Sequence, residues 1–246
     1  MFGALIGGAL VVGALAGVFL PDRERLATTV TVFGGGMLLG ALAFDVVPEA
    51  QGHAGVWWTA VGIVTGTLAF LAVDWFLTRD EGQAELRRAL QAGPTRRSAE
   101  KAGEAAAGRG KSIALGVLMD GVPETAAIGI SIAEGRVALP LLAAVVVSNL
   151  AESYGASEPI SEAGYPRRYP ILMFGGIALA LVIALVAGAT LLSDAPNGVI
   201  GTAEAVAGGA IFATVLVAII PHAFASVSRW AAVAAVAGLV SAYLLA

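Results

Sequence analysis

Residues 170–192 read PILMFGGIALALVIALVAGATLL, a run of 23 residues without a charged side chain. A helix needs about 20 mostly apolar residues to cross about 30 Å of hydrocarbon, so this run predicts a transmembrane helix. Seven other stretches of the chain have a similar length and composition. The eight predicted spans are Met1–Leu20, Thr28–Glu49, Gly55–Leu77, Ser112–Ala133, Val137–Ala156, Pro170–Leu192, Ile200–His222 and Ser228–Ala246.

The composition supports an all-α integral membrane protein with one transmembrane domain, residues 1–246. Hydrophobic residues make up 58% of the chain and charged residues only 13%, whereas soluble domains carry about 25% charge. This argues against a water-soluble enzyme. The chain has no cysteine, which excludes disulfides and thiolate metal ligands. A net charge of −4 without a clustered basic face indicates no nucleic-acid partner.

The basic residues predict the orientation of the spans, because cytoplasmic loops are enriched in Lys and Arg. With the N-terminus outside, 13 of the 14 basic residues fall in cytoplasmic loops, and only Arg136 falls outside. We therefore expect a multi-pass protein of the cell membrane with both termini outside. Segment 78–111, rich in Ala, Gly, Arg and Glu, is interpreted as a cytoplasmic loop with some frayed helix.

An internal similarity links the second and seventh predicted spans. Gly35-Gly36 precedes Pro48 as Gly208-Gly209 precedes Pro221, and both matches have an offset of 173 residues. The predicted orientation makes these segments inverted, so spans 1–3 would repeat as spans 6–8 around the central spans 4 and 5. Many secondary transporters are built this way. The alternative is a coincidence in a chain rich in Gly and Ala.

The fourth and fifth predicted spans contain polar residues that are costly inside a membrane. Asp120 and Glu124 are four residues apart, so their carboxyl groups lie on one helical face. Ser148 and Glu152 have the same spacing in the fifth span, beside Asn149. Clustered carboxylates need protons or a cation to neutralise them, and a divalent metal ion is the preferred interpretation. A proton relay and a structural polar network remain the alternatives.

Other polar residues near the ends of the spans are weaker candidates. Asp45 and Glu49 lie four residues apart at the outer end of the second span, where they form either an anionic entrance or an ordinary hydrated helix end. His222 closes the seventh span at the inner face, where it either receives an exiting cation or only ends the helix. His53 is interpreted as a lone loop histidine, and Glu204 as a carboxylate at a helix N-terminus.

Three motifs share a pattern with one transporter family. They are Asp120-Gly121-Val122-Pro123-Glu124-Thr125, Ser148-Asn149-Leu150-Ala151-Glu152-Ser153 and Asp45-Val46-Val47-Pro48-Glu49-Ala50. With the predicted architecture, they resemble the ZIP family of divalent-metal transporters, whose fourth span carries His-Asn-x-Pro-Glu-Gly. The resemblance implies eight spans, an inverted repeat and a homodimer. It also implies a metal site formed by Met37, Asp120, Glu124, Ser148 and Glu152, with Asn149 at its edge.

The resemblance implies a function as well as a site. The substrate would be zinc, iron or manganese, carried into the cytoplasm by alternating access, and no bound cofactor is expected. Asp120 in place of an imidazole favours iron(II) or manganese(II), whereas the soft thioether of Met37 favours zinc. A proton-linked transporter of another solute and a non-transporting sensor or scaffold are the alternatives. An enzyme is not expected, because the sequence shows no serine–base or aspartyl-dyad motif.

Overall fold

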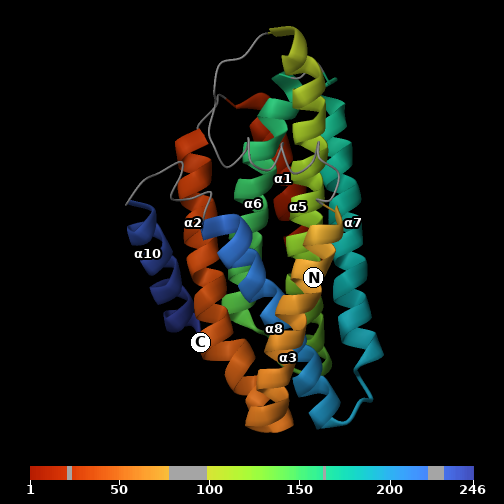
Figure 1. Ribbon diagram of the computed structural model, residues 1–246, viewed down its shortest axis with the longest axis vertical. Coiled ribbons are helices and arrows are strands. Elements are labelled where there is room, and N and C mark those ends of the chain that lie inside the picture. The colour runs from red at the N-terminus through yellow and green to blue at the C-terminus, as the bar shows by residue number, and fades with distance from the viewer. Residues whose placement is uncertain (21–23, 78–98, 163–164, 221–229) are drawn as a thin grey trace.

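The computed structural model describes residues 1–20, 24–77, 99–162, 165–220 and 230–246. Every regular element among these residues is helical, and none is a strand (Figure 1). The helices are α1 (Phe2–Phe19), α2 (Glu24–Ala41), α3 (Val47–Leu77), α5 (Ala99–Ala133), α6 (Leu139–Glu162), α7 (Arg168–Leu191), α8 (Asn197–Thr214) and α10 (Trp230–Leu245), with π-helical turns η1 (Leu42–Val46) and η2 (Val215–Ile219). The predicted all-α class is confirmed.

Six helical stretches within the described ranges are long and apolar enough to cross a membrane. One of them, Leu26–Phe76, has 51 residues and would extend about 76 Å as a single straight helix. Gly55 interrupts it with a φ of 77°, and the chain turns at the foot of the bundle between α2 and α3 (Figure 1). The stretch therefore contains two of the predicted spans, and α10 is a shorter apolar helix. A multi-pass membrane protein is thus confirmed by helix length and hydropathy.

The predicted cytoplasmic loop, residues 78–111, is expected to contain some frayed helix, and its last thirteen residues are helical. Helix α5 begins at Ala99, thirteen residues before the predicted start of the fourth span at Ser112. Its apolar part covers only Gly116–Ala133, which is why hydropathy did not detect the earlier turns. Residues 99–111 are therefore helical, whereas residues 78–98 lie outside the described part of the chain.

Packing in the bundle is dominated by four helix pairs: α3 with α8, α2 with α10, α1 with α6, and α5 with α7. The main buried apolar cluster includes Leu10 of α1, Leu38 of α2 and Phe174 of α7. Large apolar side chains also face outward, among them Trp57 and Leu244. Water-soluble proteins rarely expose so much apolar surface, whereas a lipid bilayer covers it.

The offset found in the sequence reappears in the helix boundaries. Helices α2 and α8 both have 18 residues, and their first and last residues differ by 173. The π-helical turns η1 and η2 follow them at the same offset. Because π-helical turns are rare, their recurrence at matched positions indicates that two segments of the chain share one local structure.

Glycines allow two of the helix pairs to approach at matched positions. A Cβ added at any of four glycines would overlap a carbonyl oxygen of the neighbouring helix. The four pairs are Gly36 with Ala235, Gly238 with Phe33, Gly209 with Ile63, and Gly66 with Val206. The α2 and α8 members of these pairs differ by 173 residues, and the α3 and α10 members differ by 172. The α2–α10 and α3–α8 contacts are therefore built in the same way.

Candidate metal centre

Helices α5 and α6 bring together the central group of predicted ligands. Glu124 lies at the middle of the apolar stretch Gly116–Ala133 and is only 3% exposed. Its carboxyl group is close enough to interact electrostatically with the carboxyl groups of Asp120 on its own helix and Glu152 on α6. Ser148 donates a hydrogen bond of 2.7 Å to Oε1 of Glu152. The structure therefore places three carboxyl groups and a hydroxyl at one level of the bundle.

Asp120 also interacts with helix α8. Thr214 Oγ1 donates a hydrogen bond of 3.3 Å to Oδ1 of Asp120. Thr214 is the last residue of α8, directly before the π-helical turn η2. The Asp120 carboxyl group on α5 is thus hydrogen-bonded to α8 at the residue where the α-helix of the seventh predicted span changes to a π-helical turn.

Met37 lies on the face of α2 that packs against this group. A Cβ added at Gly34 would lie 3.3 Å from the Cα and Cβ atoms of Ser148, so α2 contacts α6 there. Met37 follows Gly34 by three residues and therefore shares that face of the helix. It is buried in the apolar core, as a packing role also requires. Its role as a ligand stays a prediction.

Asn149 is the least explained member of the group. It is 1% exposed, and its Nδ2 atom has no hydrogen-bond partner in the described part of the structure. An unsatisfied buried polar group costs about 1–3 kcal/mol. The described residues therefore give Asn149 no structural function that offsets its burial.

The charge of the central group is also unbalanced. Among the residues whose side chains are described, neither Glu124 nor Glu152 forms an ion pair with a cationic side chain. Glu124 is buried, and Glu152 is half-buried with the hydroxyl of Ser148 as its hydrogen-bond donor, so neither carboxyl group has a cationic partner to offset the cost of removing its charge from water. The hydrogen bonds Ser148–Glu152 and Thr214–Asp120 are the polar links of this group among the described residues.

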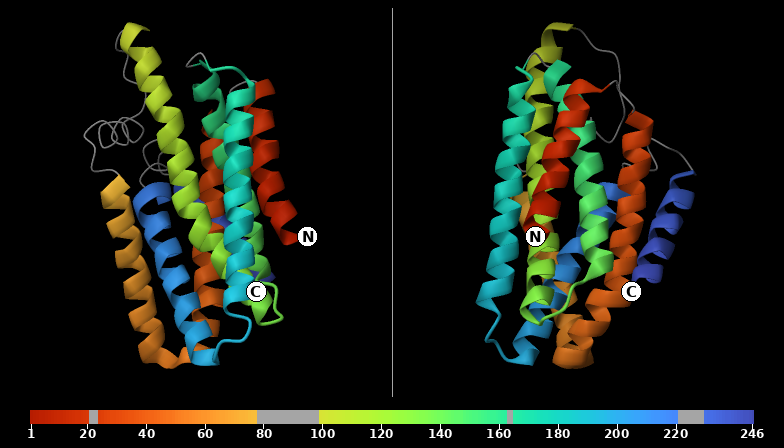
Figure 2. Two further views of the ribbon diagram at one scale, coloured as in Figure 1. Left: turned by 90° about the vertical axis from the view of Figure 1, so that its right-hand side faces the viewer. Right: turned by 180° about the vertical axis from the view of Figure 1, so that it is seen from behind.

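A second group of charged residues surrounds Arg136, which lies in the connection between α5 and α6; this connection is at the lower end of the bundle in Figure 2. Its guanidinium group contacts four carboxyl groups through one oxygen of each. The contacts are Asp45 Oδ1 at 3.3 Å, Glu49 Oε1 at 3.1 Å, Glu134 Oε2 at 2.8 Å and Glu204 Oε1 at 3.2 Å. Asp45 and Glu49, predicted to form either an anionic entrance or an ordinary hydrated helix end, thus lie together in a larger cluster.

Two interpretations of single residues are wrong in this region. His53 is part of a helix, and its Nδ1 atom lies 2.9 Å from Oε1 of Glu134, so it is not a lone loop histidine. Glu204 is 2% exposed and pairs with Arg136, so the helix N-terminus does not explain it. His222 lies outside the residues that the structure describes.

Two glycines shape the chain around this second group. Helix α5 ends in a Schellman turn, in which the amide of Arg136 donates to the carbonyl oxygen of Ser131 at 3.0 Å. Gly135 occupies the left-handed position of that turn with a φ of 76°. Gly55, with a φ of 77°, breaks the helix two residues after His53. Glycine adopts this backbone conformation without the penalty that a Cβ imposes.

Arg136 is held in its charged form. Burial lowers the pKa of Arg136, but the hydrogen bond and the charge of Glu134, together with the charge of Glu49, outweigh burial and raise the pKa above its usual value. We expect Arg136→Met to lower the free energy of unfolding by about 1–2 kcal/mol. This is less than for a fully buried ion pair, because the Arg136 side chain is 29% exposed.

A double-mutant cycle with thermal unfolding checks this expectation. Adding Glu204→Gln to Arg136→Met removes one of the carboxylates that lost its partner, so the double variant should be more stable than Arg136→Met alone. Additive losses would show that Arg136 and Glu204 are not coupled.

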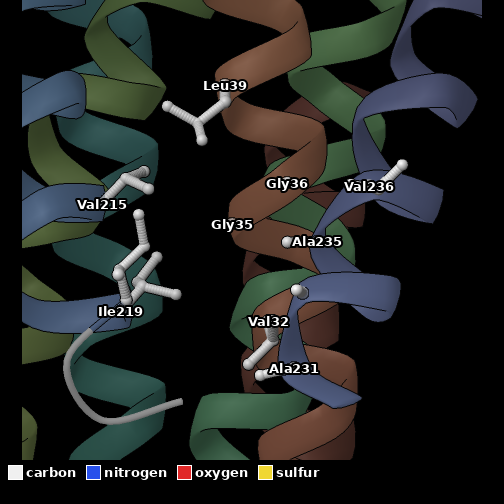
Figure 3. A pocket seen from close by; sticks show the side chains of 11 residues that line it. Val32, Gly35, Gly36, Leu39, Val215, Ile219, Ala231, Ala235 and Val236 are labelled. Atoms are coloured by element: carbon white, nitrogen blue, oxygen red, sulfur yellow. The ribbon is translucent and has the colours of Figure 1, made fainter. Parts of the chain in front are cut away.

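A pocket elsewhere in the bundle has a different character. It lies between α2, η2 and α10, has a volume of about 210 Å³, and is lined by Val32, Gly35, Leu39, Val215, Ile219, Ala235 and five similar residues (Figure 3). All of its lining residues are glycines or have apolar side chains, so it offers no side-chain ligand to a metal ion. The polar chemistry of the described residues is instead concentrated in the two charged groups.

The fold and these groups define a multi-helical membrane protein with buried carboxyl groups. No protein-family model matches the chain, and no curated protein matches it significantly.

Proposed function

We propose that this protein transports a divalent transition-metal ion, zinc, iron or manganese, into the cytoplasm. The observation that carries this proposal is that the carboxyl groups of Glu124 and Glu152 lie near each other at mid-depth of the bundle without a cationic side chain among the described residues. An ion that crosses the membrane needs ligands at that depth, and the ligands must hold it loosely enough for release. The metal ion is the substrate, and no resident cofactor is required.

The candidate ligands supply mainly oxygen atoms. Glu124, Glu152 and Asp120 offer carboxylate oxygens, and Ser148 offers a hydroxyl already directed at Glu152. Oxygen donors suit manganese(II) and iron(II), and the thioether of Met37 adds a softer donor on the facing helix. Metal binding would displace protons from the carboxyl groups, so protonation on the cytoplasmic side would favour release.

The two helix pairs with the same packing are the elements that would move during transport. The α2–α10 and α3–α8 pairs are built alike, and α5 and α6 lie between them and the rest of the bundle. We infer eight membrane crossings with both termini outside, in which spans 1–3 repeat as inverted spans 6–8. Rocking of such repeats around a fixed site opens it to each side of the membrane in turn. A homodimer in the cell membrane stays part of this proposal.

Uptake into proteoliposomes that contain the full-length protein tests the proposal. We expect manganese(II), iron(II) or zinc(II) to accumulate faster than in protein-free liposomes of the same lipid. A pH-sensitive dye inside the vesicles separates the alternatives. Proton flux without uptake of any of the three metals would favour the proton-linked transporter, and the absence of both fluxes would favour a sensor or scaffold.

A further inference from the structure

The group around Arg136 has more carboxyl oxygens than the guanidinium can pair. Each carboxyl group uses one oxygen for Arg136. The second oxygens of Asp45, Glu134 and Glu204 are buried and have no hydrogen-bond partner among the described residues. The side chains of Glu134 and Glu204 are only 7% and 2% exposed. Bulk solvent therefore barely reaches Glu134 and Glu204, and the described residues form no hydrogen bond with these three oxygens.

The imidazole of His53 lies where two of these oxygens point. Its Nδ1 atom is 2.9 Å from Oε1 of Glu134 and 3.7 Å from Oε2 of Glu204. The contact at 2.9 Å does not have hydrogen-bond geometry, because both of its atoms remain without a hydrogen bond. Ligand atoms around one four-coordinate metal ion are separated by about 3.3 Å, because metal–ligand bonds are about 2.0–2.2 Å long.

Glu49 completes a set of three residues. Glu49, His53 and Glu134 each offer one ligand atom, and these atoms lie within 4.8 Å of one another. Glu49 is four residues before His53, so both side chains leave the same face of their helix. Arg136 contacts Glu49 and Glu134 through Oε1 and Oε2, respectively, and so restricts how both carboxyl groups turn.

The charge of the group favours a cation over a hydrogen-bonded network. Four carboxyl groups surround a single guanidinium group, so carboxyl groups are in excess over cationic partners in this cluster. A divalent ion reduces this excess and supplies a partner for the orphaned oxygens. One imidazole with carboxylates is a donor set for first-row divalent metals such as manganese(II), iron(II) and zinc(II).

We propose that Glu49, His53 and Glu134 form a second divalent-metal site, with the free oxygen of Glu204 directed at it and Arg136 fixing the carboxyl groups. The site is separate from the central group. Glu134, directly after the end of α5, follows Glu124 by ten residues, which corresponds to about 15 Å along the helix axis, so one ion cannot contact both. The proposal does not require transport, since it concerns only binding at this end of the bundle.

The small number of histidines makes a sharp experiment feasible. The chain has two, His53 and His222, so the His222→Gln variant retains a single imidazole. We suggest pulsed electron paramagnetic resonance of manganese(II) added to this full-length variant in lipid nanodiscs. The expected result is a nitrogen-14 coupling from one directly bound imidazole, which disappears when His53→Gln is added. A coupling that persists without His53, or bound manganese(II) with no nitrogen coupling, would overturn the proposal.

Two further variants keep the test independent of folding and of the central site. Glu134→Gln should weaken manganese(II) binding about tenfold or more while leaving the imidazole in place. Asp194→Asn, at an exposed loop position, is the matched carboxyl control and should change nothing. Combining Glu124→Gln with Glu152→Gln should leave the nitrogen coupling intact. If metal uptake fails but the nitrogen-14 coupling persists, the transport proposal is wrong and the second site is supported. If uptake is observed but the nitrogen-14 coupling is absent, only the second site is wrong.

Discussion

Replacing Glu124 by glutamine is expected to lower the initial rate of divalent-metal uptake by about 100-fold or more. Loss of a residue that only supports a ligand typically costs 10–100-fold, and loss of a charged ligand should cost at least as much. Glutamine has nearly the same shape, so the packing around this 3% exposed position is retained. The measurement is uptake into proteoliposomes with equal amounts of incorporated protein.

A stability measurement separates a ligand from a structural residue. Because Glu124 has no cationic partner in the described structure, Glu124→Gln should leave the metal-free melting temperature unchanged or raise it. Added metal should stabilise the wild-type protein, since a ligand that binds only the folded state raises its stability, and this shift should vanish in the variant. Asp194→Asn should retain both uptake and the shift. A variant that melts lower and still transports would refute the role of Glu124 as a ligand.

Alanine at Gly36 or Gly209 is expected to lower the free energy of unfolding by about 3 kcal/mol. Overpacking in a closely packed core costs about 1–3 kcal/mol, and the upper end applies because the added Cβ meets a backbone carbonyl, which cannot rotate away. The two losses should be similar, because Gly36 and Gly209 occupy matched positions in the α2–α10 and α3–α8 contacts. Thermal or denaturant unfolding of the full-length protein measures them.

Two glycines of α7 provide the control. A Cβ added at Gly175 or Gly176 has no atom within 4 Å, so alanine there should stabilise the helix by about 0.5–1 kcal/mol. A lower free energy of unfolding for alanine at Gly36 and Gly209, with a higher one for alanine at Gly175 and Gly176, would support the duplicated close packing. Equal, small effects at all four positions would mean that the helix pairs are further apart than the structure places them.

The membrane character of the chain could be predicted because hydropathy reports directly on the bilayer. In hydrocarbon every backbone amide needs a partner within its own segment, so long apolar stretches become helices. Hydropathy does not locate the first residue of α5, because it detects only the apolar part of that helix. Residues 99–111 are too polar for a span, but their many alanines favour a helix that continues beyond the apolar region.

The central carboxyl groups could be predicted for a similar reason. Asp120 and Glu124 share a helical face because of their spacing alone, and charges in an apolar stretch are conspicuous. The hydrogen bond from Thr214 to Asp120 was not predictable, because 94 residues separate them along the chain. No local pattern indicates which part of α8 faces α5.

The sequence by itself determined the helical class, the repeat offset of 173, the carboxyl pair on α5 and the hydroxyl–carboxyl pair on α6, because each depends on helical periodicity or on transfer into lipid. Only the tertiary structure decided the second charged group. His53, Glu134 and Glu204 are unremarkable one by one, and Arg136 looked like one stray basic residue outside. They meet because the Gly135 turn and the break at Gly55 direct distant segments to one end of the bundle. Such contacts depend on how helices pack, and sequence spacing carries no information about them.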